Sequence, residues 1–311
     1  MDETIVAVKC ISCASENTRF EGIVSQRPGR FQSGDSTLVQ CPVCGIRFRH
    51  PVADLAALEE LYTNTAHTTW PDDDFRRDHY LALNLIRYMP QPLGVLDFGC
   101  YSGAFLCKLP SGCRRYGIEL SESASAVARQ RGVEILGKTI KAIDAKYDNF
   151  DCITMFDVIE HLTTPVETLT SLSKLLRPGG TLIISTGDSD SLLWRLHPMS
   201  YYYYYNEHLT FYNARWFRWF AQRAGLRIAV QRRFVRDKVT FGGTLRQFAL
   251  LALYDFTQML YRCRVSRFVA GVFPFSKTLR WTVAPQLSAF PDHLFVALQK
   301  EESNENRHCD D

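Results

Sequence analysis

The length and composition of the chain predict a folded protein rather than a disordered or membrane-spanning one. Its 311 residues are 46% hydrophobic, which is enough for one large domain with a smaller one beside it. The longest apolar run begins at Phe248 and ends before Asp255, well short of the ~20 residues of a membrane span. The first twenty residues also lack the apolar segment of a secretory signal, so we expect a cytoplasmic protein whose ten cysteines bind metal or stay reduced.

The net charge of +3 conceals a strongly basic stretch in the C-terminal third. From Phe211 to Phe290 there are fourteen Lys or Arg residues and only two acidic ones, Asp237 and Asp255. Such a stretch suits contact with nucleic acid, with an anionic membrane surface or with a phosphorylated substrate, and a merely solvated basic face explains it equally well. Charge alone therefore leaves the partner open.

Two cysteine pairs of the CxxC type stand near the start of the chain: Cys10 with Cys13, and Cys41 with Cys44. Thiolates at this spacing can hold one tetrahedral zinc ion, and Gly45 permits the tight turn that follows the second pair. A redox pair is the alternative, but neither CxxC stands at a strand–helix junction. Residues 1–50 are therefore predicted to form a zinc-ribbon module, whose four sulfur ligands leave no open position on a structural zinc.

Residues 51–92 have a helical pattern and are predicted to form a linker or cap. Beyond them, short apolar runs alternate with helical segments, which predicts a mostly parallel sheet with helices on both faces. The expected strands are Val95–Phe98, Tyr116–Ile118, Val133–Leu136, Cys152–Phe156, Leu182–Ser185, Leu226–Arg233 and His293–Gln299. The expected helices are Ala104–Leu109, Ser123–Arg131, Val166–Leu176 and Ala214–Ala224, the last capped by Asn213 and stopped by Gly225. We expect an α/β fold with a Rossmann-like seven-stranded sheet over residues 93–233, completed by a last strand at 292–300.

An insertion at residues 234–291 separates the last two strands. Its mixture of apolar side chains with arginines predicts one or two amphipathic helices. Burial against the sheet edge is the simplest role, while a lid, a dimer surface and a peripheral membrane contact remain alternatives, and the oligomeric state stays open. Residues 301–311 are predicted to form an acidic disordered tail.

The first strand of the expected sheet leads into a turn that contains Asp97, Gly99, Tyr101 and Gly103. Glycine lets a ligand approach the backbone closely and adopts positive φ without penalty. Glu119 ends the next strand, where a carboxylate can accept hydrogen bonds from both hydroxyls of a ribose. The pattern is DxGxxxG rather than the GxGxxG of dinucleotide-binding proteins, with Tyr101 where a further glycine would stand.

Four segments together resemble the motifs of class I S-adenosylmethionine-dependent methyltransferases. The first is Val95–Gly103, in which Tyr101 stands where the family has glycine. The others are Tyr116–Leu120, the FDxVxxxxVxEHxxxP-like stretch Phe150–Pro165, and the turn Leu175–Gly180. The resemblance extends over about Leu93–Arg233 and His293–Lys300, and four motifs in order are more specific than any one of them.

This resemblance implies a binding site for S-adenosylmethionine. Asp97, Gly99 and Gly103 would hold the methionine end of the cofactor, and Glu119 would bind its ribose. The residues implied beside the adenine or the sulfonium are Leu120, Thr139, Ile140 and Phe156. Tyr101 departs from the family, and its side chain would either cover the cofactor or narrow its site.

The segment after the expected fifth strand, Tyr201–Tyr212, resembles a Tyr-x-Glu-His segment of sugar C-methyltransferases, which also have an N-terminal zinc module. Within it, His208 is the predicted proton acceptor, and Glu207 would hold one nitrogen of its ring. His161, which follows the fourth strand, is a further catalytic candidate. For either histidine the alternative is a purely structural role in hydrogen bonding. Of the run Tyr201–Tyr205, only alternate residues are expected to face the core, because an extended chain points successive side chains to opposite sides.

The sequence thus favours a methyltransferase acting on an oxygen or carbon of a small molecule, such as a sugar nucleotide or another polyhydroxylated metabolite. An RNA methyltransferase, with the zinc ribbon and the basic stretch binding phosphates, is the first alternative. Against it, the fourth strand ends in Phe156-Asp157-Val158 and not in the Asn/Asp-Pro-Pro-aromatic sequence of enzymes that methylate base amino groups. A cofactor-binding regulator without turnover is the second alternative.

Overall fold

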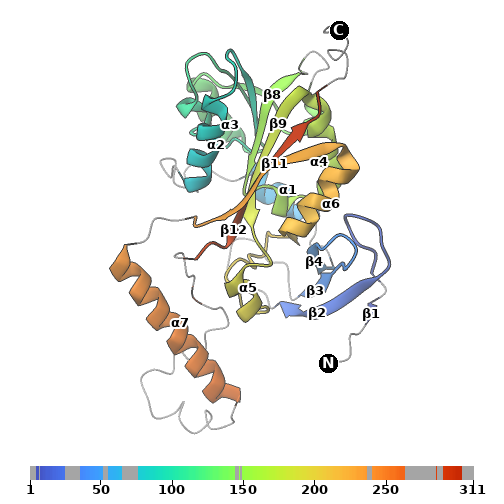
Figure 1. The fold of residues 1–311 in the computed structure, drawn as a ribbon, viewed down its shortest axis with the longest axis vertical. Coiled ribbons are helices and arrows are strands. Elements are labelled where there is room, and N and C mark those ends of the chain that lie inside the picture. Colours follow the sequence, from blue (N-terminus) through green and yellow to red (C-terminus); the bar gives the residue numbers. More distant parts are fainter. Residues whose placement is uncertain are drawn as a thin grey trace, which may run out of the picture.

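The computed structural model describes two sheets (Figure 1), and the smaller one takes a strand, residues 210–211, from the chain between two strands of the larger one. The residues it describes are 5–6, 8–24, 36–51, 55–64, 76–143, 147, 149–236, 240–262, 285 and 290–302. None of the helices in these ranges is both long enough and apolar enough to cross a membrane.

The larger sheet has seven strands in the order β11-β12-β9-β8-β5-β6-β7. Its strands are β5 (Gly94–Phe98), β6 (Arg114–Ile118), β7 (Glu134–Gly137), β8 (Phe150–Phe156), β9 (Leu176–Gly187), β11 (Leu226–Phe234) and β12 (His293–Lys300). The first five in chain order run parallel, whereas β12 lies antiparallel between β9 and β11. The predicted Rossmann-like α/β sheet is therefore confirmed, and the carboxyl ends of its parallel strands meet at one edge.

Helices cover both faces of this sheet (Figure 1). The helices α2 (Arg77–Arg87) and α3 (Glu122–Gln130) lie on one face, and α4 (Pro165–Leu175) and α6 (Ala214–Ala224) lie on the other. Helix α6 begins and ends as predicted, since the Asn213 side chain accepts a hydrogen bond from the Trp216 amide and Gly225 adopts a left-handed conformation.

The prediction of an α-helix at Ala104–Leu109 is wrong. The structure has only a one-turn 3-10 helix, Leu106–Lys108, in this place. Gly103 has a φ of 73°, which belongs to the preceding turn, and Leu109 is extended because it precedes Pro110. Too few residues remain between these two constraints for an α-helix.

The smaller sheet has the order β1-β2-β3-β4-β10. Four of its strands come from the N-terminal module: β1 (Ile5–Val6), β2 (Thr18–Val24), β3 (Ser36–Gln40) and β4 (Arg47–His50). The fifth, β10 (Thr210–Phe211), belongs to the segment that follows β9 and pairs with β4. The zinc-ribbon module is therefore joined by backbone hydrogen bonds to the very segment that contains His208.

The remaining elements are peripheral helices: α1 (Leu55–Thr63), α5 (Leu192–Leu196) and α7 (Phe241–Arg262), with short 3-10 turns at Ile140–Ala142 and Ile159–His161. Helix α7 is the described part of the predicted insertion, and it extends away from the sheet beside α5 (Figure 1). Most of residues 263–291 and the predicted tail from residue 303 onward lie outside the described residues.

Candidate active site

The four predicted zinc ligands come together at the N-terminal module. The Cys10 and Cys44 sulfurs are 3.6 Å apart, and the Cys13 and Cys41 sulfurs are 3.5 Å apart. All four sulfurs lie within 4.8 Å of one another, which is close to the ~3.8 Å expected for a zinc tetrahedron with ~2.3 Å bonds and far longer than a disulfide. Gly45 has a φ of 89° in the turn after the second pair, as its position predicts. These residues fit a structural zinc ion.

Asp97 ends β5 as a buried carboxyl group, with a side chain that accepts a 2.7 Å hydrogen bond from the Thr154 hydroxyl. Burial raises the pKa of Asp97 to about 7, because no cation among the described residues lies within hydrogen-bonding distance of it. The turn beyond it needs glycine, since Gly99 has a φ of 82° and a Cβ there would lie 2.6 Å from the Val158 side chain. A buried carboxylate beside a glycine turn suits a cationic ligand such as the amino group of a methionine moiety.

Glu119, at the end of β6, is held by the same turn. Its two carboxylate oxygens accept 2.8 Å hydrogen bonds from the backbone amides of Tyr101 and Ser121. Each oxygen keeps a lone pair for a ribose hydroxyl, so Glu119 and Asp97 fit the two ends of S-adenosylmethionine. Tyr101 has a φ of 49°, which explains why the family motif has glycine there: the position demands a left-handed backbone.

The other residues implied beside the cofactor lie at the same edge of the sheet. Leu120 follows Glu119, and Thr139 and Ile140 begin the 3-10 turn after β7. Phe156 ends β8, and its ring packs edge-on against the rings of His79 and Phe105. The ring centroids are 4.8 Å apart in both pairs. Whether these side chains contact a cofactor stays a prediction.

His208 lies just before β10, in the region predicted to face the methyl acceptor and called below the acceptor side, and it is buried with 6% of its surface exposed. Its Nδ1 lies 2.8 Å from the carbonyl oxygen of Tyr203, to which it can only donate. The interaction expected from Glu207 is not made: that residue contributes its backbone carbonyl to Nδ1 of His161, at 3.1 Å. Burial and the neighbouring His161 lower the pKa of His208 well below 6.5. The ring is therefore neutral near pH 7, with its proton on Nδ1 and a lone pair on Nε2.

Glu160 and His161 reach the same place from the turn after β8. The Glu160 carboxylate accepts hydrogen bonds from the hydroxyls of Tyr203 and, at 3.0 Å, of Thr186. The His161 ring lies 4.6 Å from that of His208, edge to face, and one ligand-type atom of each of Glu160, His161 and His208 lies within 4.8 Å of the others. We call Glu160, His161, Tyr203 and His208 the acceptor-side cluster.

The run Tyr201–Tyr205 does not alternate as predicted. Its first four tyrosines are all buried, and only Tyr205 is substantially exposed. The segment is turned rather than extended, since backbone amides at 204 and 205 bond to carbonyls at 201 and 203. The prediction that only alternate tyrosines face the core is therefore wrong, because it assumed an extended chain.

A second buried histidine was missed by the sequence analysis. His293, 1% exposed at the start of β12, directs Nδ1 at the Asp292 carboxylate 2.7 Å away. Burial opposes its protonation, but this hydrogen bond to Asp292 raises the pKa of His293. Tyr201 and Tyr202 donate their hydroxyls to the other oxygen of Asp292. The adjacent Asp-His pair is a weak signal in the sequence, because nothing local shows which residues surround it.

Arg49 was also missed, although it connects the zinc-ribbon module to the histidine segment. Its guanidinium is 1% exposed and donates to the carbonyl oxygens of His208 at 2.9 Å, Tyr204 at 3.0 Å and Tyr205 at 3.1 Å. A fourth bond of 2.6 Å goes to the Ser36 hydroxyl, and burial without a carboxylate partner lowers the pKa of Arg49 to about 10. One arginine of the ribbon therefore fixes the backbone that carries His208.

Comparison with known proteins places these features in a family. The model of a methyltransferase domain matches residues 75–231, just over half of the chain. The ubiquinone biosynthesis O-methyltransferase of Thiobacillus denitrificans is 30% identical over 148 residues, which are 43% of this chain and 62% of that protein. The protein of the same name from Nitrosococcus oceani is 31% identical over 147 residues, 43% of this chain and 61% of that protein. The chain thus matches less than two thirds of these relatives.

Among solved structures, a chain from the complex of the Haloferax volcanii Trm112 methyltransferase activator with a methyltransferase is similar in fold. It superposes with a TM-score of 0.50 at 17% sequence identity, over 79% of this chain and 98% of that one. At this level of identity the likeness supports the fold alone.

Proposed function

This chain belongs to the class I S-adenosylmethionine-dependent methyltransferases, and from that premise we propose that it methylates a hydroxylated small molecule, with His208 as the proton acceptor. When bound, the cofactor supplies an electrophilic methyl group on its sulfonium. The acceptor is a sugar nucleotide or a similar polyhydroxylated metabolite, and the reacting atom is an oxygen or a carbon. Relatives named as O-methyltransferases favour oxygen.

The protonation state of His208 carries this proposal. A general base must be unprotonated at working pH and must have a free lone pair. The Tyr203 carbonyl fixes the proton on Nδ1, and the low pKa keeps the ring neutral. Among the described residues Nε2 of His208 has no hydrogen-bond partner, so it can accept a proton from an acceptor hydroxyl as the methyl group transfers.

The surroundings of His208 favour a small acceptor over a large one. The rings of Tyr203 and Tyr205 lie 4.5 and 5.1 Å from the His208 ring and offer apolar faces with polar edges, which suit sugars and aromatic rings. Glu160, Tyr203 and His208 are buried and His161 is partly buried, so a nucleic acid would have to extrude a base to reach them. His161, 4.6 Å away, is proposed as an assisting residue, and Glu207 as a backbone support for it.

Labelling can test the proposal directly. The zinc-loaded protein is incubated with S-adenosylmethionine carrying an isotopic methyl group, in one arm with a metabolite extract and in another with total RNA. We expect one class of metabolite to gain the label and the His208→Asn protein to transfer little. His197→Asn, which alters a histidine paired with Asp255 beside α5, is the matched control and should behave as wild type. Label entering RNA while every metabolite stays unlabelled would overturn the proposal.

A further inference from the structure

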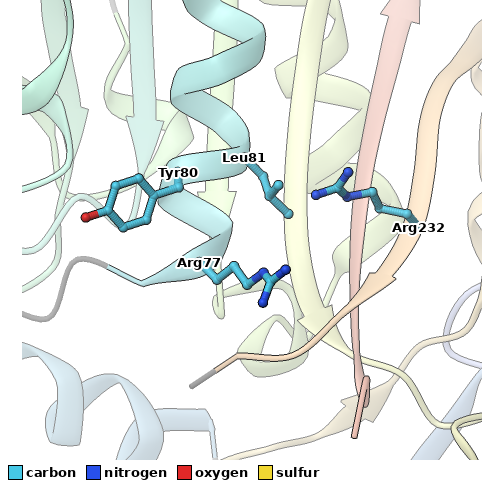
Figure 2. A pocket seen from close by; sticks show the side chains of 4 residues that line it. All are labelled: Arg77, Tyr80, Leu81 and Arg232. Carbon is cyan, nitrogen blue, oxygen red and sulfur yellow. The ribbon is translucent and has the colours of Figure 1, made fainter. Parts of the chain in front are cut away.

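A hollow of about 250 Å³ lies between helix α2 and strand β11, on the surface of the methyltransferase domain. It is lined by Arg77, Tyr80 and Leu81 from the helix and by Arg232 from the strand. Figure 2 shows the two arginine side chains reaching from opposite sides into the space between helix and strand, with Leu81 beside them. Two guanidinium groups from separate elements therefore share one small space.

Within the described residues, these two arginines differ from their neighbours in having no carboxylate partner. Arg76 and Arg236 both pair with Asp157, and Arg233 pairs with Asp188. Within the part of the chain that the structure describes, neither Arg77 nor Arg232 forms an ion pair or a side-chain hydrogen bond. The described residues thus supply carboxylates to the flanking arginines but not to this pair, and an anion between the two guanidinium groups would be stabilised by both charges.

A second hollow of about 160 Å³ adjoins the first, since Leu81 and Arg232 line both. Its other lining residues are mostly apolar: Asn84, Leu85, Val230 and Phe295. The two hollows together form a groove along α2 with a cationic end and a largely apolar floor. Such a groove suits a molecule whose charged group is at one end and whose remainder is less polar.

The cationic end lies toward the ligand-binding edge of the sheet. Arg76, directly before Arg77, contacts Asp157 just beyond the end of β8 at 2.5 Å. Asp78, directly after it, accepts a 2.6 Å hydrogen bond from Ser185 near the end of β9. The start of α2 is therefore anchored at the two strand ends that flank the acceptor side.

We propose that the hollow between Arg77 and Arg232 binds a phosphate or diphosphate group, and that this group belongs to the methyl acceptor. The second part rests on the proposed function, whereas the first does not. Guanidinium groups bind phosphate oxygens in a bidentate manner, and two of them match a group with two or more negative charges better than a single carboxylate. The positive end of the α2 dipole, at the start of the helix, also favours binding of an anion there.

Binding of inorganic pyrophosphate tests the first part without any turnover. Calorimetry is carried out at constant ionic strength on the zinc-loaded protein saturated with S-adenosylhomocysteine. We expect saturable binding, weakened about tenfold by Arg77→Gln or Arg232→Gln and more by the double variant. Arg218→Gln removes a charge from α6 that is likewise exposed, and it should leave the affinity unchanged. Equal weakening by all three single variants, or no saturable binding, would overturn the site.

The source of the phosphate is tested by comparing uridine diphosphate with dodecyl phosphate below its micelle concentration. If uridine diphosphate binds more tightly than pyrophosphate, the acceptor is linked to a nucleotide. If dodecyl phosphate binds more tightly than pyrophosphate, the acceptor is a lipid phosphate that lies along the apolar hollow. If neither improves on pyrophosphate, the link to the acceptor is overturned while the anion site stands. Because none of these measurements uses methyl transfer, their failure is separate from failure of the proposed function.

Discussion

The regions around Asp97 and around His208, called here the cofactor side and the acceptor side, differ in how many of their carboxylates pair with a cation. On the cofactor side, Asp97 is buried and Glu119 is partly buried, burial raises the pKa of each carboxyl group, and no described cation pairs with either. On the acceptor side, cations pair with two carboxylates: Asp157 has Arg76 and Arg236, and Asp292 has His293. Glu160 resembles Asp97 instead, since among the described side chains it accepts only from the hydroxyls of Tyr203 and Thr186 and burial raises its pKa.

This difference indicates which of the two sides is held in place by contacts within the protein and which one depends on a bound ligand. We expect a cationic ligand to supply the counter-charge that the cofactor side lacks, so that ligand binding and folding stability oppose each other there. On the acceptor side, cations of the protein pair with Asp157 and Asp292, and the Tyr203 carbonyl holds His208 in one tautomer. Variants on the two sides should therefore have opposite effects on stability and binding.

The largest effect is expected from His208→Asn on the acceptor side. Turnover should fall roughly 10²–10⁴-fold, the usual contribution of a general base, while the affinity for S-adenosylhomocysteine stays unchanged. Because the pKa of His208 is lowered, the wild-type enzyme should keep its activity as pH falls to 6.5 and lose it only below that value. Rates across pH and calorimetry on the same preparations provide the test.

Glu119→Gln is the matched comparison from the cofactor side and should show the reverse pattern, with weaker cofactor binding and an intact acceptor side. A His208→Asn protein that melts earlier than wild type but turns over normally would assign His208 a structural role only.

The second effect concerns Asp97→Asn, which should stabilise the free protein. The pKa of Asp97 is about 7 in the folded chain and 3.8 when unperturbed, so ionisation opposes folding increasingly from about pH 4 to 7. Above pH 7 the penalty is at most about 4 kcal/mol. Asparagine keeps the oxygen that accepts from Thr154 and removes the charge.

The expected result for Asp97→Asn is a higher melting temperature than wild type at pH 8, no difference near pH 4, and weaker binding of S-adenosylhomocysteine. Unfolding curves at the two pH values measure the first two, and calorimetry the third. A variant less stable than wild type at pH 8 would contradict the idea that this side is incomplete without its ligand.

The same contrast explains what the sequence could predict. Asp97, Gly99 and Glu119 lie in one turn and an adjacent strand end, so short motifs locate them, and the positive φ of Gly99 follows from local geometry. The acceptor side depends on contacts between distant segments: Arg49 and His208 are 159 residues apart, and Tyr201 and Asp292 are 91 apart. Residue patterns place His208 after the fifth strand but cannot identify the carbonyl or the arginine that orients it.

The third effect concerns Arg49→Met, which breaks the connection between the ribbon and the acceptor side. Four hydrogen bonds are lost and the carbonyls of Tyr204, Tyr205 and His208 lose a buried donor. We expect a loss of about 2–3 kcal/mol in stability and faster hydrogen exchange in the segment around His208. Affinity for S-adenosylhomocysteine should not change, since none of these bonds reaches Asp97 or Glu119.

Two further variants sharpen the test of Arg49. Arg49→Lys should restore only part of the protection, because one ammonium group cannot reach all the acceptors that the guanidinium spans. Cys41→Ser should release zinc and loosen the same segment through β4 and β10. Unchanged exchange around His208 in the metal-free protein would show that the ribbon and the acceptor side are independent.

The smallest effect concerns Tyr101, where the cofactor side contains backbone strain. At a φ of 49° any side chain with a Cβ costs about 1–2 kcal/mol, and glycine does not. Tyr101→Ala keeps this strain, whereas Tyr101→Gly relieves it, and the amide that bonds to Glu119 remains in both. We therefore expect the glycine variant to be the more stable of the two by about 1 kcal/mol, the reverse of the usual order of alanine and glycine. Melting temperatures of the pair measure this directly, and a more stable alanine variant would mean that the turn relaxes out of the left-handed region.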